Sequence, residues 1–219
     1  MSDILNKLEK LDKNSLEKTC YISIDVETTG PIPGKYSMIA LGATVVGEYK
    51  HGERLCFYRE LKPLNSSYTI DAMRIACLGL ECLKAYKSDL RYNPKNSDFQ
   101  PKKVLDLMYE QCVSPKKVMQ EFSEWITVVS KNRKIVEVAT PIKFDGMFTS
   151  WYFYNFLNKS PLGYSGLDIN SLYKGLKKDL TSHIEELHLR KKNGLTHNAL
   201  EDAIQQSIEL EKIINLMIQ

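Results

Sequence analysis

The sequence predicts an α/β protein whose mixed central sheet has about five strands, three antiparallel and the rest parallel, with helices on its faces. Two observations lead to this prediction. Three apolar, strand-like segments in the first third of the chain are joined by short links, which favour antiparallel neighbours. After them, helical and strand-like patterns alternate, as they do where parallel strands are connected by helices.

The first strand is expected at residues 20–26, an apolar run that ends before Thr28-Thr29-Gly30 and a turn rich in proline and glycine. Residues 38–46 and 54–61 are predicted to be the next two strands. Helical segments are expected at 71–76 and 80–86. The following segment, 87–103, is polar and contains two prolines, so we expect a loop or an insertion there.

In the second half of the chain, apolar side chains recur at helical spacing between residues 115 and 129. Residues 135–139 and 164–167 are predicted to be short strands. Three further helices are predicted, at 146–157, at 169–176 and at 199–217, the last with a continuous apolar side. We therefore expect a single domain over residues 20–219, preceded by an amphipathic helical arm at 1–19.

The composition excludes a coiled coil, a disordered chain and a disulfide scaffold. Thirty Lys and Arg against 27 Asp and Glu give a net charge of +3, which neither indicates nor excludes a nucleic-acid partner. Five scattered cysteines without a C-x-x-C pair suggest reduced thiols. No signal peptide is apparent, and no stretch approaches the ~20 apolar residues of a membrane span. We expect a soluble, cytoplasmic protein with no membrane partner.

Two acidic residues lie at the end of the first strand. The two-residue period of a strand puts Asp25 and Glu27 on one face, about 7 Å apart, with the apolar residues on the other. Like charges held this close are costly unless a cation lies between them, and a divalent metal is the usual solution. An ordinary solvated strand end is the alternative explanation.

Two further signals lie later in the chain. Asn198 is a good N-cap for the last helix, with Glu201 at the capping-box position, so that His197 precedes the helix and Asp202 lies on its first turn. Asp145 follows the 135–139 strand and opens an aromatic helix. Each signal has a plain structural alternative: a capped surface helix with an unrelated histidine, and an aspartate that complements a helix dipole.

The order and spacing of these motifs resemble the DEDDh family of 3′–5′ exonucleases, which have a ribonuclease H-like fold. The resemblance rests on Asp-Val-Glu-Thr-Thr-Gly at 25–30, Phe-Asp at 144–145 and His-Asn-Ala-Leu-Glu-Asp-Ala at 197–203. It implies that four carboxylates bind two divalent cations, Mg²⁺ or Mn²⁺, and that His197 is the general base. The four implied ligands are Asp25, Glu27, Asp145 and Asp202. Oxygen ligands suit hard cations, and two metals about 4 Å apart can act together on a phosphodiester.

The resemblance also suggests substrate contacts. Thr28, Thr29 and Met38 match the part of the family pocket that receives the terminal nucleotide. Lys143 could contact a phosphate, although an exposed lysine is the simpler interpretation. Phe148 or Trp151 could stack on a base, although most of that aromatic run has core spacing. The basic triplet Arg190, Lys191 and Lys192 lies five residues before His197 and could border the cleft.

The leading hypothesis is a metal-dependent exonuclease that releases 5′-mononucleotides from the 3′ ends of single-stranded RNA or DNA. A catalytically inactive module that binds nucleic acid or docks a partner is the alternative, and an endonuclease on the same fold is a third. The sequence does not choose between RNA and DNA, and it leaves a homodimer open.

Overall fold

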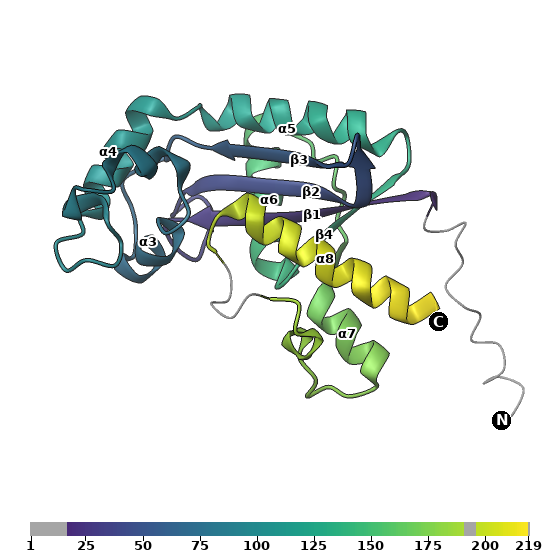
Figure 1. Ribbon diagram of the computed structural model, residues 1–219. Coiled ribbons are helices and arrows are strands. Elements are labelled where there is room, and N and C mark those ends of the chain that lie inside the picture. Colours follow the sequence, from purple (N-terminus) through teal and green to yellow (C-terminus); the bar gives the residue numbers. More distant parts are fainter. Residues whose placement is uncertain (1–16, 191–195, 219) are drawn as a thin grey trace, which may run out of the picture.

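The structure is a computed structural model that describes residues 17–190 and 196–218 (Figure 1). Its sheet has five strands in the order β3-β2-β1-β4-β5. They are β1 (Thr19–Thr28), β2 (Met38–Lys50), β3 (Glu53–Glu60), β4 (Lys134–Ala139) and β5 (Gly166–Asp168). β1, β2 and β3 pair antiparallel, whereas β4 and β5 run parallel to β1. The predicted mixed sheet is confirmed.

The helices connect and cover these strands. The α-helices are α3 (Ile70–Ala76), α4 (Pro101–Gln111), α5 (Pro115–Ser130), α6 (Ile142–Leu157), α7 (Ile169–Lys177) and α8 (Ala199–Ile218). The 3₁₀ helices are η1 (Glu81–Tyr86), η2 (Leu90–Tyr92) and η3 (Ile184–Leu187). None of the helices in the described part of the chain combines the length and the apolar character needed to cross a membrane.

Several boundaries differ from the sequence-based expectation. The segment 80–86 forms the 3₁₀ helix η1, and α4 begins at Pro101, inside the expected loop 87–103. α4 was not predicted; its buried face is formed by Val104, Leu105, Leu107 and Met108. α6 begins at Ile142 rather than at 146, because the Asp168 carboxylate accepts a hydrogen bond from the Ile142 amide at the start of the helix (3.2 Å). The predicted arm at 1–19 lies outside the described residues except for its last three, and Thr19 already belongs to β1.

The two faces of the sheet carry different layers. The apolar side of β1, with Ile22, Ile24 and Val26, packs against α5 and α6 in the largest core cluster. Its other side faces α8, which crosses β1 and β2 and is drawn in yellow (Figure 1). The alternation of side chains predicted for this strand therefore separates an apolar, buried face from the face that carries the carboxylates.

One glycine sets how closely α8 approaches the sheet. A Cβ atom on Gly42 would lie 2.2 Å from the backbone carbonyl carbon of Ala199, the first residue of α8. Gly42 is also the antiparallel partner of Asp25 across the β1–β2 pair. The missing side chain at Gly42 thus lets the N-terminus of α8 lie directly on β2, beside the carboxylates of β1.

Candidate active site

The acidic pair of β1 lies on the face predicted from the strand period. The Asp25 carboxylate accepts a hydrogen bond from Nε2 of Gln206 on α8 (3.0 Å), which shows that it faces this helix. Glu27 is 7% exposed and belongs to the same face, two residues further along the strand. The two side chains therefore lie between the end of β1 and the N-terminal part of α8.

The N-terminus of α8 holds its own aspartate tightly. One carboxylate oxygen of Asp202 accepts hydrogen bonds from the amide and the hydroxyl of Thr196 (2.9 and 3.1 Å), and the other accepts from the His197 amide (2.9 Å). His197 adopts a left-handed backbone conformation with φ of 55°. A histidine in this region is strained, and such strain persists where surrounding contacts fix the backbone. Asp202 provides that contact.

The predicted helix cap is confirmed in one half only. The Asn198 side chain accepts hydrogen bonds from the amides of Leu200 and Glu201 (3.1 and 3.2 Å), as an N-cap does. The capping box predicted for Glu201 does not form, because the Asn198 amide donates to the Thr196 hydroxyl instead (3.3 Å). Thr196 therefore accepts the hydrogen bond from the Asn198 amide that was expected for Glu201. Its hydroxyl also donates a hydrogen bond to Asp202.

Asp145 reaches the same site from the other side of the sheet. It lies on the first turn of α6, is 3% exposed, and accepts a hydrogen bond from the Val26 amide (3.1 Å). Val26 stands between Asp25 and Glu27 in β1. The side chain of Asp145 is thus tied to the backbone of the strand that carries the other two carboxylates.

These side chains form one cluster of negative charge. Burial raises the pKa of Asp25 well above its usual range, and the nearby carboxylates of Asp145, Glu27 and Asp202 raise it further. Burial followed by Asp202 and Asp145 raises the pKa of Glu27, and burial raises that of Asp145 to about 8. Ligand atoms of Glu27, His197 and Asp202 lie within 4.8 Å of one another. Carboxylate oxygens packed this way are the ligands that hard divalent cations prefer, so these residues could hold a divalent metal.

Two buried residues next to this cluster, Gln206 and Glu137, were not predicted from the sequence. Gln206, 2% exposed, accepts a hydrogen bond from the Thr140 amide at the end of β4 (2.8 Å) while its Nε2 donates to Asp25. Its position one helical turn after Asp202 was the only available signal. Glu137 on β4 accepts a hydrogen bond from the Thr149 hydroxyl (2.7 Å), and burial raises its pKa to about 7.

The residues expected to receive the terminal nucleotide lie at the end of β1 and the start of β2. Thr28 and Thr29 are buried, and the Thr29 hydroxyl donates to the Ser67 carbonyl (2.8 Å) and accepts from the Ser37 amide (2.9 Å). The Met38 amide donates to the Tyr152 hydroxyl (2.6 Å). These contacts order the backbone next to Glu27. Lys143 is exposed on the first turn of α6, two residues before Asp145.

Two of the expected substrate contacts are corrected by the structure. Phe148 is fully buried and packs on Phe144, so its ring is a core side chain and offers no stacking surface. Arg190 forms an ion pair with Glu209 (2.6 Å), which is 1% exposed, and a second one with Glu185 (3.7 Å). Its guanidinium group is therefore already paired within the protein. Lys191 and Lys192 lie outside the described residues.

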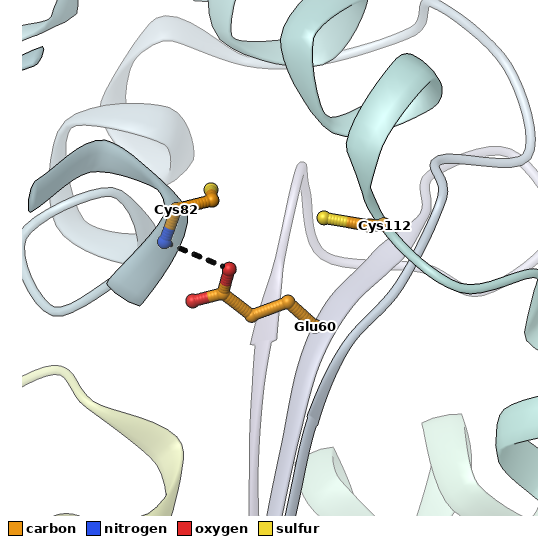
Figure 2. Close-up of side chains that lie close together, drawn as sticks. All are labelled: Glu60, Cys82 and Cys112. Atoms are coloured by element: carbon orange, nitrogen blue, oxygen red, sulfur yellow. Dashed lines mark hydrogen bonds between the residues drawn. The ribbon is translucent and has the colours of Figure 1, made fainter. Parts of the chain in front are cut away.

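A second group of ligand-type side chains consists of Glu60, Cys82 and Cys112 (Figure 2). The Glu60 carboxylate accepts hydrogen bonds from the Cys82 amide (3.0 Å), the Glu81 amide and the Tyr58 hydroxyl (2.7 Å). Its oxygens thus bind the free amides at the start of η1. Glu60 acts here as a cap that ties the end of β3 to η1.

Comparisons with known proteins agree with this geometry. No family model matches the chain. The 3′–5′ DNA exonuclease Cap18 of Escherichia coli is 32% identical over 205 residues, which are 91% of this chain and 93% of that protein.

Two examples illustrate the solved structures that share the fold. The nuclease domain of 3′hExo, a DEDDh family member bound to rAMP, has a TM-score of 0.60 at 12% identity, over 90% of this chain and 91% of that one. E. coli Exonuclease I in complex with a dA16 oligonucleotide has a TM-score of 0.56 at 14% identity, over 90% of this chain but only 41% of that one. The fold, the cluster of carboxylates and the 32% identity to a relative that is covered over 93% of its length lead to one conclusion: this chain belongs to the DEDDh-type 3′–5′ exonucleases.

Proposed function

We propose that the protein is a metal-dependent exonuclease that removes 5′-mononucleotides from the 3′ end of single-stranded DNA. The observation that carries this proposal is the convergence of Asp25, Glu27, Asp145 and Asp202 beside His197. The choice of DNA over RNA follows from the relative that is named a 3′–5′ DNA exonuclease.

In this proposal the four carboxylates hold two divalent cations, Mg²⁺ or Mn²⁺. The residues fit such a pair, because each of Asp25, Asp145 and Asp202 is oriented by at least one hydrogen bond and the neighbouring carboxylates raise the pKa of Asp25. When bound, the cations supply Lewis-acid activation of water and stabilise the charge that develops on the phosphate.

His197 is the general base in this scheme. Its imidazole lies beside Glu27 and Asp202 and takes a proton from the attacking water. The water oxygen bonds to the scissile phosphorus as the bond from phosphorus to the 3′-oxygen of the preceding nucleotide breaks. The released product is a 5′-mononucleotide, and the shortened strand keeps a 3′-hydroxyl.

A degradation assay tests this function. Matched single-stranded DNA and RNA oligonucleotides, labelled at the 3′ or the 5′ end, are incubated with Mg²⁺, Mn²⁺ or EDTA. We expect stepwise shortening from the 3′ end, preference for DNA, and loss of activity in EDTA and in Asp25→Ala. Asp106→Ala, an exposed carboxylate on α4, is the matched control and keeps full activity.

Other results would lead to a different conclusion. A fully active Asp25→Ala protein would overturn the mechanism. Binding without hydrolysis in any metal would favour the inactive nucleic-acid-binding module, and cleavage of an oligonucleotide with a blocked 3′ end would favour the endonuclease.

We also propose that the protein works in a reducing compartment such as the cytoplasm, which is supported by the five free cysteines. A homodimer stays a prediction, and light scattering on the purified chain tests it.

A further inference from the structure

A cavity of about 740 Å³ opens directly beside His197. Thr196 and His197 form one end of it. The other walls come from the link between α3 and η1, from η1 itself, and from the loop after η2. A cavity of this volume is in the range of pockets that bind ligands. We call it the η1 groove.

The charge of the η1 groove is one-sided. Lys84, Lys87 and Lys95 line it, and none of the described residues that line it is an aspartate or glutamate. This differs from the chain as a whole, in which basic and acidic residues nearly balance. Lys84 pairs with Glu81 at the surface (2.6 Å), whereas no ion pair is recorded for Lys87 or Lys95 within the part of the chain that the structure describes. The groove therefore offers cationic side chains to a ligand with several negative charges.

Both walls of the η1 groove are held in place by buried or partly buried contacts. Arg74 on α3 donates hydrogen bonds to the carbonyl oxygens of Pro94 (2.6 Å) and Asn96 (3.1 Å), next to Lys95. Glu60 caps η1, the helix that carries Lys84 (Figure 2). Because these contacts fix the walls before any ligand arrives, binding requires little ordering of the backbone.

Gly79, in the link between α3 and η1 that lines the η1 groove, packs against the backbone of His197 and Asn198. The Asn198 side chain donates a hydrogen bond to the Gly79 carbonyl (2.8 Å), and a Cβ atom on Gly79 would lie 2.3 Å from the His197 carbonyl oxygen. His197 is itself one of the lining residues, so a ligand in the groove lies next to the residue proposed as the general base.

We infer that the η1 groove binds the single strand on the 5′ side of the scissile phosphate, with Lys84, Lys87 and Lys95 contacting successive backbone phosphates. This inference rests on the proposed function for the position of the scissile bond. The number of phosphates on each side of the scissile bond indicates which part of the strand the groove binds. The departing terminal nucleotide carries only the scissile phosphate, whereas the retained strand supplies several phosphates in a row.

The aromatic side of the groove suits the same ligand. Tyr92 lines the cavity and packs against Tyr86, with ring centroids 4.8 Å apart. A base can stack on such a ring whatever its identity. Phosphate contacts from lysines and stacking on tyrosine carry no base-specific hydrogen bonds, so we expect the groove to bind strands of any sequence.

The test compares two triple variants with equal changes of charge. Lys84→Ala/Lys87→Ala/Lys95→Ala removes the groove lysines. Lys116→Ala/Lys117→Ala/Lys134→Ala removes three exposed lysines of α5 and β4 that do not line the groove. Fluorescence anisotropy in EDTA measures the Kd for a 15-nucleotide single strand over a range of salt concentrations. Kinetics with Mn²⁺ then compare the same strand with a dinucleotide.

We expect the groove variant to bind the long strand at least 10-fold more weakly than the control. The slope of log Kd against log salt should fall by about 2, since each phosphate contact on a single strand contributes about 0.7. Its KM should rise for the long strand and change less than twofold for the dinucleotide, which is too short to reach the three lysines. Circular dichroism and Tm confirm that both variants fold.

Two failures are distinguishable. Equal binding and equal KM in the two triple variants, with an active wild-type enzyme, would overturn the groove inference alone. A wild-type protein that hydrolyses no oligonucleotide in any metal would overturn the proposed function, while the anisotropy measurements would still decide whether the η1 groove binds the strand.

Discussion

The backbone amide of His197 donates a hydrogen bond to a carboxylate oxygen of Asp202, at 2.9 Å. This contact joins the proposed general base to one of the proposed metal ligands through the backbone rather than through the imidazole. It leaves the ring nitrogens of His197 available for proton transfer, and it holds the left-handed backbone of His197 in place.

His197→Gly should separate catalysis from stability. A left-handed residue costs about 1 kcal/mol or more unless it is glycine, so this variant should unfold with a free energy no lower than that of the wild type. His197→Ala keeps the strained backbone and should be less stable than His197→Gly. Both should lose at least 10²-fold in kcat, as removal of a general base does. Chemical denaturation and single-strand degradation measure the two properties. An active glycine variant would contradict this prediction.

Asp25→Asn should stabilise the metal-free protein. The raised pKa of Asp25 means that the folded state holds its proton more tightly than the unfolded state, so the metal-free wild type loses stability as the pH rises above the usual range of an aspartate. Removing this charge should raise Tm in EDTA at pH 8. The asparagine oxygen can still accept the hydrogen bond from Gln206, so this contact is kept. Mn²⁺ should raise the Tm of the wild type and not that of the variant. A lower Tm for Asp25→Asn in EDTA would show that the cluster is not a source of repulsion.

Gln206→Met should weaken metal binding without unfolding the protein. The variant keeps the length of the side chain but removes the amide that positions Asp25 and accepts from the Thr140 amide. Loss of a residue that orients a metal ligand typically costs 10–100-fold in affinity or activity. We therefore expect a higher Mn²⁺ concentration for half-maximal activity. Gln205→Met, the neighbour whose amide donates to the Leu189 carbonyl, is the control; an identical metal dependence in both variants would refute a positioning role.

Glu137→Gln should change how stability depends on pH. Because the folded pKa of Glu137 is about 7, above the value of about 4.3 for an unfolded glutamate, the wild type loses stability as the pH rises between these values. Glutamine can still accept the Thr149 hydrogen bond and does not ionise. In EDTA, the variant should be more stable by about 3 kcal/mol at pH 8.5 and nearly equal at pH 4. Urea denaturation at several pH values measures this, and the exposed Glu110→Gln should show no such trend.

Arg190→Met tests whether Arg190 serves the fold or the substrate. Removing its guanidinium group leaves the buried Glu209 carboxylate uncompensated, which typically costs about 3–5 kcal/mol. The double variant Arg190→Met/Glu209→Met should recover most of that loss, because two apolar side chains can replace a buried ion pair. The KM for single-stranded DNA should not change in the double variant. A stable single variant with a raised KM would restore Arg190 as a substrate contact.

The parts of the fold that the sequence predicted well depend on local patterns. The period of two in β1 placed Asp25 and Glu27 on one face, and Asn198 marked the start of α8 between His197 and Asp202. Both patterns involve residues within a few positions of one another, so strand and helix geometry decide them. α4 was missed because the prolines and polar residues before it suggested a loop that continues to 103.

Contacts between distant parts of the chain were beyond such patterns. Gln206 and Asp25 are 181 positions apart, and only the packing of α8 on β1 brings them together. The same holds for charged side chains. Arg190 stands next to two lysines in the sequence, but in the structure it forms an ion pair with the buried Glu209. The partner of a charged side chain depends on which element packs beside it, and no local rule states this.

The sequence by itself determined the class of sheet, the acidic motifs and the family they resemble, because strand period, helix capping and motif spacing are properties of short segments. The tertiary structure alone decided which basic residues border the site. It placed Lys84, Lys87 and Lys95 along a groove that opens at His197, and it buried Phe148 in the core. Burial and charge pairing arise where separate elements meet, so they are set by the packing of the whole chain.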